Sequence, residues 1–162
     1  MRLIAAVIVL GLTACAGAPP SSPADQFQKQ LELAQAGDAK QQSILGVLYA
    51  RGRGVPQNDA EAVKWYERAA AQGHAQAKVN LGYMYEQGRG VPQDYARAVS
   101  LYQEGVSSGN TDGMRNLAWA YVMGHGVKKD RARAMDLWNR CASMGDVQCQ
   151  EALAMSPALL SQ

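Results

Sequence analysis

The sequence predicts an all-α fold in which a unit of 36 residues, built from two helices, occurs three times. Two observations support this fold class. Glycines recur at a constant step of 36 residues, and the segments between them carry apolar side chains three or four positions apart, which is the spacing of one helix face. Stacked helix pairs of this kind form a solenoid whose core is shared between neighbouring repeats.

The composition of the chain excludes several other classes of protein. The chain has 162 residues, of which 48% are hydrophobic and 19% are charged, so it can bury a core and differs from a disordered tail. Its formal net charge of +2 is too balanced for the electrostatic footprint of a nucleic-acid-binding protein. Two histidines and three cysteines leave few ligands for a metal or haem site. We therefore expect no cofactor, no metal and no nucleic-acid partner.

Residues 1–14 have the features of a secretory signal. Arg2 precedes an apolar run, residues 3–12, that is too short to span a bilayer as a mature helix. The run ends in Leu12-Thr13-Ala14-Cys15, which resembles the lipobox of bacterial lipoproteins. The resemblance implies cleavage before Cys15 and lipidation of Cys15, and multiple acyl chains anchor a protein stably. An ordinary secretory signal with an incidental cysteine is the alternative.

A tether and a capping helix are predicted next, at residues 15–24 and 25–37. The tether consists of small residues and proline, a composition that favours an extended chain. Ala16 follows the cysteine, which by resemblance to the enterobacterial sorting rule implies the outer membrane, with the domain on its periplasmic face. The helix aligns with the second helix of a repeat, but Lys29 and Gln30 replace aromatic residues, as a polar cap requires.

The repeats themselves are predicted at residues 38–73, 74–109 and 110–145. In the second repeat, Gly88 and Gly90 suggest a backbone with positive φ after the first helix, and Asp94 is suited to cap the second helix. Gly82 lies inside the first helix, where glycine costs about 1 kcal/mol relative to alanine. We therefore expect the paired helix to approach Gly82 closely.

Three motifs in these units resemble Sel1-like repeats, which are relatives of the tetratricopeptide repeats. They are Leu-Gly-x-x-Tyr at 45–49 and 81–85, Gly-x-Gly-Val at 52–55, 88–91 and 124–127, and Ala62-x-x-Trp65-Tyr66-x-x-Ala69-Ala70. The resemblance implies a right-handed α-solenoid with a concave surface lined by the first helix of each repeat.

A C-terminal capping helix is predicted at residues 146–156, ending before Pro157, with a tail at 157–162. Cys141 and Cys149 flank the preceding turn, and antiparallel neighbouring helices can bring such positions to disulfide distance. Their spacing resembles the Cys-x7-Cys of cysteine-rich Sel1-like proteins, in which such bridges join a helix pair, and an oxidising periplasm favours the bond. A free redox pair and a metal site are the alternatives.

The sequence contains no arrangement typical of an active site, and we expect the protein not to be an enzyme. His74 follows a helix-ending glycine and is interpreted as a helix-start residue, and His125 is interpreted as a loop residue. No Gly-rich phosphate-binding loop joins a strand to a helix. The alternative of a β-lactam-binding or weakly hydrolysing enzyme would need an activated serine or a metal, and no Ser-x-x-Lys motif occurs.

The predicted function rests on the concave face. Helix geometry places six candidate binding residues there: Asn80, Tyr83, Glu86, Arg115, Asn116 and Trp119. Aromatic and arginine side chains are common anchors of protein interfaces. Resemblance to related repeats implies that Asn80 and Asn116 contact the backbone of an extended peptide. The asparagines could instead brace a loop, and the two aromatic side chains could instead pack between repeats.

The sequence thus predicts a monomeric, membrane-anchored scaffold without enzymatic activity, which binds a protein or peptide partner in the cell envelope. One alternative is an immunity protein that neutralises a secreted interbacterial effector such as a phospholipase. Another is support of an envelope complex, by the same binding mechanism.

Overall fold

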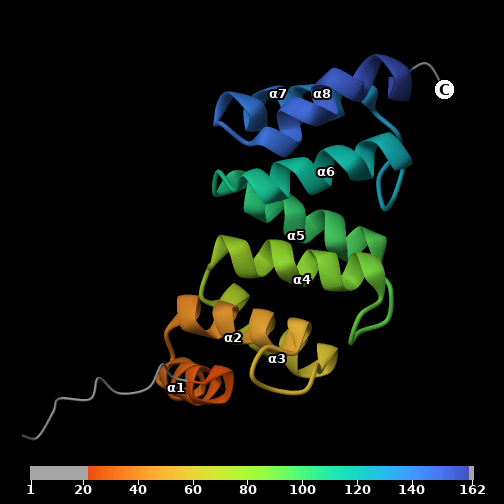
Figure 1. The fold of residues 1–162 in the computed structure, drawn as a ribbon. Helices are drawn as coiled ribbons and strands as arrows, with labels where there is room; N and C mark the ends of the chain where they lie inside the picture. The colour runs from red at the N-terminus through yellow and green to blue at the C-terminus, as the bar shows by residue number, and fades with distance from the viewer. Residues whose placement is uncertain (1–21, 161–162) are drawn as a thin grey trace, which may run out of the picture.

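The computed structural model describes residues 22–160 and contains eight α-helices and no strand in that range. The helices are α1 (Pro23–Gln35), α2 (Ala39–Arg51), α3 (Asp59–Ala71), α4 (Ala75–Gln87), α5 (Tyr95–Ser107), α6 (Thr111–Met123), α7 (Arg131–Ser143) and α8 (Val147–Leu160). They stack in chain order from α1 at one end to α8 at the other (Figure 1). The predicted all-α solenoid is confirmed.

The eight helices fall into two sets that alternate along the chain. The first helix of each repeat, here called helix A, is α2, α4 or α6, and α8 lies in the same register. The second, here called helix B, is α3, α5 or α7, and α1 lies in the same register. Polar side chains at equivalent positions cap these helices, and His74 does so through Nδ1, which accepts a hydrogen bond from the backbone N–H of Ala77 at 3.2 Å. The interpretation of His74 as a helix-start residue is confirmed.

The N-terminal cap begins earlier than the sequence suggests. The predicted boundary between tether and helix at residues 24 and 25 is wrong, because α1 starts at Pro23 and ends at Gln35. Ser22 accepts a hydrogen bond from the N–H of Asp25, whose carboxylate accepts from the N–H of Ser22, and proline suits the first helical position. Residues 1–21, with Cys15 and the signal peptide, lie outside the described residues.

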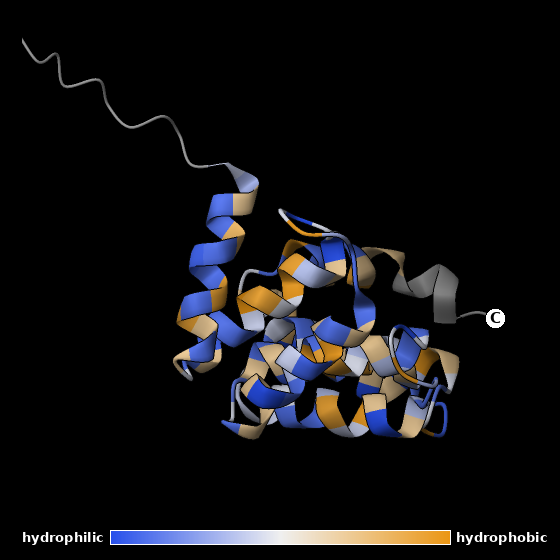
Figure 2. Ribbon diagram, turned by 90° about the horizontal axis from the view of Figure 1, so that it is seen from below, coloured by the Kyte–Doolittle hydropathy of each residue, from blue (hydrophilic) through white to orange (hydrophobic). Residues whose placement is uncertain are grey.

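The cap packs on the first repeat through a small apolar cluster. The ring of Phe27 meets the ring of Tyr49 edge-on at 5.3 Å between centroids, and Ala34 is fully buried. The rest of α1 is largely hydrophilic (Figure 2), and Gln30 donates hydrogen bonds to Gln41 of α2. This polar surface is what the end of a solenoid requires.

The C-terminal helix is longer than predicted. The expectation that it ends before Pro157 is wrong, because α8 continues to Leu160. Proline supplies no backbone N–H to a helix, but alanine and leucine follow it and favour the helical conformation. Residues 161–162 of the predicted tail lie outside the described residues.

Within each repeat, helix A and helix B approach most closely where a small residue faces an aromatic ring. A Cβ atom on Gly82 would lie 2.7 Å from Cε1 of Tyr102, and one on Gly46 would lie 2.5 Å from Cε1 of Tyr66. Both distances are shorter than real Cβ contacts, so glycine is required for this packing. The expected close approach at Gly82 is confirmed.

Neighbouring repeats also meet where each A–B loop lies on the start of the preceding helix B. Arg89 makes a bidentate ion pair with Asp59, with Nη2 to Oδ1 at 2.7 Å and Nε to Oδ2 at 3.0 Å. The Arg89 guanidinium holds the pKa of the Asp59 carboxyl below its usual range. One repeat later the same place is filled by His125, whose ring lies against the ring of Tyr95 at a tilt of 30°, with ring centroids 4.4 Å apart. His125 is therefore a packing residue.

Candidate functional site

A groove with a volume of about 400 Å³ opens across helices A of the three repeats. It is lined by Val47, Ala50 and Arg51 of α2, Tyr66 of α3, Gln76, Val79, Asn80, Tyr83 and Met84 of α4, Arg89 of the following loop, and Asp112, Arg115 and Asn116 of α6. Helices α4 and α6 touch each other along it. The groove is thus built by the helix set that the sequence placed on the concave face.

Four of the six predicted binding residues lie together in this groove. Asn80, Tyr83, Arg115 and Asn116 line it, and the Tyr83 side chain is the most accessible, with 44% of its surface exposed. An exposed tyrosine beside two amides offers both apolar contact and hydrogen bonds. These groups are suited to bind a peptide backbone and its side chains.

Glu86 and Trp119 do not line the groove, and each has a partner inside the fold. The Glu86 carboxylate accepts a hydrogen bond from the hydroxyl of Tyr102 at 2.5 Å. Burial, and secondarily that carboxylate, raise the pKa of Tyr102. Trp119 packs edge-on against the buried Trp138, with ring centroids 5.2 Å apart. Both side chains therefore stabilise the fold, as the sequence left open for Trp119.

Arg115 also has a structural role. Its guanidinium pairs with Asp112 on the same helix and with Asp146 at 3.1 Å. Asp146 in turn caps α8, since its carboxylate accepts a hydrogen bond from the N–H of Cys149 at 3.0 Å. With two carboxylates already on it, Arg115 offers little net charge to a ligand and holds the terminal helix against α6.

A ladder of side-chain hydrogen bonds forms the polar floor of the groove. Nε2 of Gln76 donates to Asn80 at 3.2 Å and to Asp112 at 3.0 Å. Oε1 of Gln76 accepts from Nδ2 of Asn110 at 2.8 Å. Since Asn110 and Asp112 belong to the next repeat, the ladder fixes the relative position of α4 and α6 and so the width of the groove.

The lining residues that were not among the six predicted ones include Arg51, Tyr66 and Arg89. Tyr66 is 3% exposed and was interpreted as core, yet its side chain reaches the groove. Arg89 belongs to a loop, and its approach to α2 depends on how neighbouring repeats stack. A signal for Tyr66 was present in the sequence, because Ala50 stands where the second repeat has Glu86.

The comparison with protein families decides the identity of this fold. The Sel1 repeat family matches residues 42–74, 75–110 and 111–146. The chain belongs to the Sel1 repeat family. Sel1 repeats commonly mediate contacts between proteins.

Solved structures of other Sel1 repeat proteins have the same fold. A Sel1 repeat protein from Oxalobacter formigenes is 36% identical with a TM-score of 0.74, and the match covers 80% of this chain and 51% of that one. The protective antigen c5321 of uropathogenic Escherichia coli is 32% identical with a TM-score of 0.76, over 85% and 30% of the two chains. Cysteine-rich protein B of Helicobacter pylori, at 16% identity and a TM-score of 0.67 over 81% and 97%, shares the fold alone.

A curated relative comes from yeast. The chitin synthase regulator SKT5 of Saccharomyces cerevisiae is 44% identical over 69 residues, which is 40% of this chain. This chain spans about a tenth of that regulator and about half of the Oxalobacter protein.

Among the described helices, none combines the length and apolar character needed to cross a membrane.

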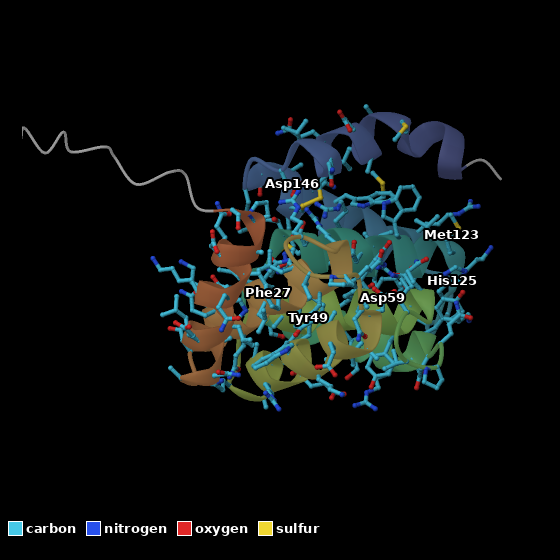
Figure 3. The ribbon with its side chains drawn as sticks, turned by 60° about the horizontal axis from the view of Figure 1, so that its bottom comes forward. Phe27, Tyr49, Asp59, Met123, His125 and Asp146 are labelled. Carbon is cyan, nitrogen blue, oxygen red and sulfur yellow. A yellow bond between two sulfur atoms is a disulfide. The ribbon has the colours of Figure 1, made fainter. Side chains whose placement is uncertain are left out.

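A disulfide closes the last B–A turn of this Sel1 repeat protein. Cys141 and Cys149 are bonded with an S–S distance of 2.11 Å and a Cα–Cα distance of 5.9 Å, and both are fully buried. The predicted pairing is confirmed, and the bond lies close to Asp146 (Figure 3). Asp146 and the two sulfur atoms lie near enough to share a metal ion, but the sulfur atoms are bonded to each other and Asp146 pairs with Arg115.

Proposed function

We propose that this Sel1 repeat protein is a scaffold of the bacterial cell envelope, anchored to the outer membrane by a lipid on Cys15, which binds a segment of another protein in the groove. The observation that carries the proposal is an open groove lined by an exposed tyrosine, Tyr83, and by two asparagines, Asn80 and Asn116. The yeast relative is named as a regulator of an enzyme, which is in keeping with a role in binding other proteins.

The groove favours a short, extended segment over a small metabolite. Its lining combines apolar side chains of α2 and α4 with polar side chains of α4 and α6, and none of the lining residues is a serine, cysteine or histidine that could serve as a nucleophile or base. Asn80 and Asn116 are placed to exchange hydrogen bonds with a peptide backbone, and Tyr83 is placed to pack on an apolar side chain. This arrangement supports binding of a protein segment.

Tyr83→Ala is expected to weaken binding of the partner at least tenfold, because aromatic side chains at the centre of an interface carry much of its energy. The partner is first found by placing a photo-crosslinking amino acid at Tyr83 in the full chain, in cells, and its affinity for the purified variants is then measured. Asn80→Ala is expected to act in the same direction with a smaller effect. Arg115 and Trp119 are unsuitable probes, since their replacement would also loosen the fold.

Glu67→Ala is the matched control, because Glu67 is exposed on α3, outside the groove lining. Its affinity for the partner should equal that of the wild type. A crosslink that forms equally well at Glu67, or an unchanged affinity after Tyr83→Ala, would show that the groove is not the binding site. A captured effector of a competing bacterium, such as a phospholipase, would assign the immunity function, and a subunit of an envelope complex would assign the assembly function.

Lipid anchoring is tested separately at Cys15. The full chain expressed in bacteria is expected to incorporate a labelled fatty acid and to sediment with the outer membrane. Cys15→Ser should abolish the labelling and the sedimentation, while the helical signal of the purified domain stays unchanged. Wild-type protein that is secreted without label would instead show an ordinary signal peptide and an incidental cysteine.

A further inference from the structure

The second repeat shows how a buried tyrosine hydroxyl is satisfied in this fold. The ring of Tyr102 lies on Gly82, and its hydroxyl extends along α4 to the next helical turn, where it meets the Glu86 carboxylate at 2.5 Å. Tyr102 is 1% exposed, so this carboxylate is the partner of an otherwise buried polar group. A hydrogen bond to an ionised acceptor is stronger than one between neutral groups.

The first repeat has the same tyrosine without the carboxylate. Tyr66 lies on Gly46 as Tyr102 lies on Gly82, but the residue one turn further along α2 is Ala50. Within residues 22–160, no group makes a hydrogen bond with the Tyr66 hydroxyl, although the residue is only 3% exposed. Tyr66 and Ala50 both line the groove. The tyrosine hydroxyl therefore has a carboxylate partner in the second repeat, whereas in the first repeat it faces the groove without a hydrogen-bond partner among the described residues.

Two arginine side chains, Arg51 and Arg89, lie near this hydroxyl, together with the carboxylate of Asp59. Nη2 of Arg89 donates to the carbonyl of Ala50 at 3.0 Å, and Arg51 follows Ala50 directly; both arginines line the groove. Asp59 balances Arg89, whereas Arg51 is exposed and makes no ion pair within the described residues. Burial raises the pKa of Tyr66 to about 12, so its hydroxyl keeps the proton at neutral pH and can donate it in a hydrogen bond.

We propose that the groove contains a carboxylate subsite, formed by the Tyr66 hydroxyl, Arg51 and Arg89 beside Ala50, which takes a carboxylate of the bound peptide. The ligand group occupies the place that the Glu86 carboxylate fills in the second repeat. The proposal rests on the peptide-binding function of the groove and adds the chemistry of one position in its ligand. An acidic side chain and a C-terminal carboxylate both supply this group.

The test uses three blocked tripeptides and the purified domain, residues 22–162 with the disulfide intact, followed by NMR. The probes are acetyl-Gly-Glu-Gly-amide, its glutamine analogue, and acetyl-Gly-Gly-Gly with a free carboxylate. We expect saturable shifts of the Ala50, Arg51 and Arg89 signals with the glutamate probe, the free-acid probe or both, and at least tenfold weaker binding of the glutamine probe. Which carboxylate binds more tightly distinguishes a side chain from a chain terminus.

Two variants make the test specific. Tyr66→Phe keeps the ring on Gly46 and removes only the hydroxyl, so the carboxylate probes should bind about tenfold more weakly. Tyr102→Phe is the matched control in the second repeat and should leave their binding unchanged. Ala50→Glu supplies an internal carboxylate at the position of Glu86, so it should prevent probe binding and raise the unfolding temperature.

The outcomes separate this proposal from the function of the groove. Equal binding of the glutamate and glutamine probes, or unchanged binding after both Tyr66→Phe and Ala50→Glu, would overturn the carboxylate subsite. In either case a partner crosslinked at Tyr83 would leave the groove as a binding site. Absence of any shift with the carboxylate probes would also overturn the subsite, and absence of a crosslink at Tyr83 would overturn the function on which it rests.

Discussion

Gly90→Ala is expected to destabilise the protein by about 2–5 kcal/mol. Two effects contribute: alanine adopts the left-handed backbone of Gly90 only at a cost, and its Cβ atom would overlap with a neighbouring helix. Gly90 has φ of +71°, and an added Cβ would lie 2.4 Å from the carbonyl carbon of Asp59 and 2.7 Å from the amide nitrogen of Ala60. Both are backbone atoms in the first turn of α3, so the whole helix would have to move. Urea denaturation followed by circular dichroism measures the loss.

Gly109→Ala separates the two contributions. Gly109 has nearly the same backbone, with φ of +74°, but nothing lies within 4 Å of an added Cβ. This variant should therefore lose only the conformational part, about 1–2 kcal/mol. Equal losses for the two variants would mean that the contact between the loop and α3 contributes nothing. A larger loss of unfolding free energy at Gly90 would show that this contact, together with the Arg89–Asp59 ion pair, stabilises the packing of neighbouring repeats.

Removal of the disulfide in a Cys141→Ser, Cys149→Ser double variant is expected to lower the free energy of unfolding by about 2.5 kcal/mol. The reason is that the unfolded chain regains the conformational entropy that the cross-link takes from it. The two cysteines are separated by eight positions and are both fully buried. The loss should be local, because α8 has a neighbouring helix on one side alone among the described helices. Amide hydrogen exchange should therefore speed up in α8 and the end of α7 and stay unchanged in α2–α4.

Reduction of the wild-type disulfide by a phosphine is the matched treatment and should change exchange in the same two helices. Asp146→Ala removes the other tie between α8 and α6, its ion pair with Arg115, and should add to the effect of the double variant. If the double variant unfolds at the same urea concentration as the wild type, packing and the Arg115–Asp146 pair alone hold α8. Exchange that rises throughout the chain would instead show that the solenoid unfolds as one unit.

Much of the fold was predictable because the step of 36 residues repeats the same local chemistry. Glycine at helix ends, polar caps such as Asp94, and Gly82 beneath a tyrosine of the paired helix are each readable from neighbouring residues and from their recurrence. The disulfide followed from the same register, since Cys141 and Cys149 flank one turn. The end of α8 was not predictable from Pro157 alone, because the effect of a proline on a helix end depends on the residues that follow it.

The sequence predicts which face of the solenoid carries the groove, but it does not predict which side chains on that face are free to bind a ligand. Arg115 and Glu86 lie on the expected helices, yet each is held by a partner from another helix, Asp146 and Tyr102 respectively. Such pairings depend on distances between helices, which periodicity along one chain does not contain. Tyr66 was missed for the opposite reason, because it shares its position with buried residues of the other repeats while its own surroundings differ at Ala50.

The register of the end helices also changes how the chain can be divided. Since α1 is a helix B and α8 a helix A, the eight helices form four B–A hairpins, each closed by a tight turn such as the one at Gly73. The longer A–B loops, residues 52–58, 88–94 and 124–130, then connect one hairpin to the next. A cut in a loop would fall between two hairpins, whereas a cut in a turn would divide one. The covalent bridge lies inside the fourth hairpin, so the two helices of that hairpin would stay linked even after a cut in their turn.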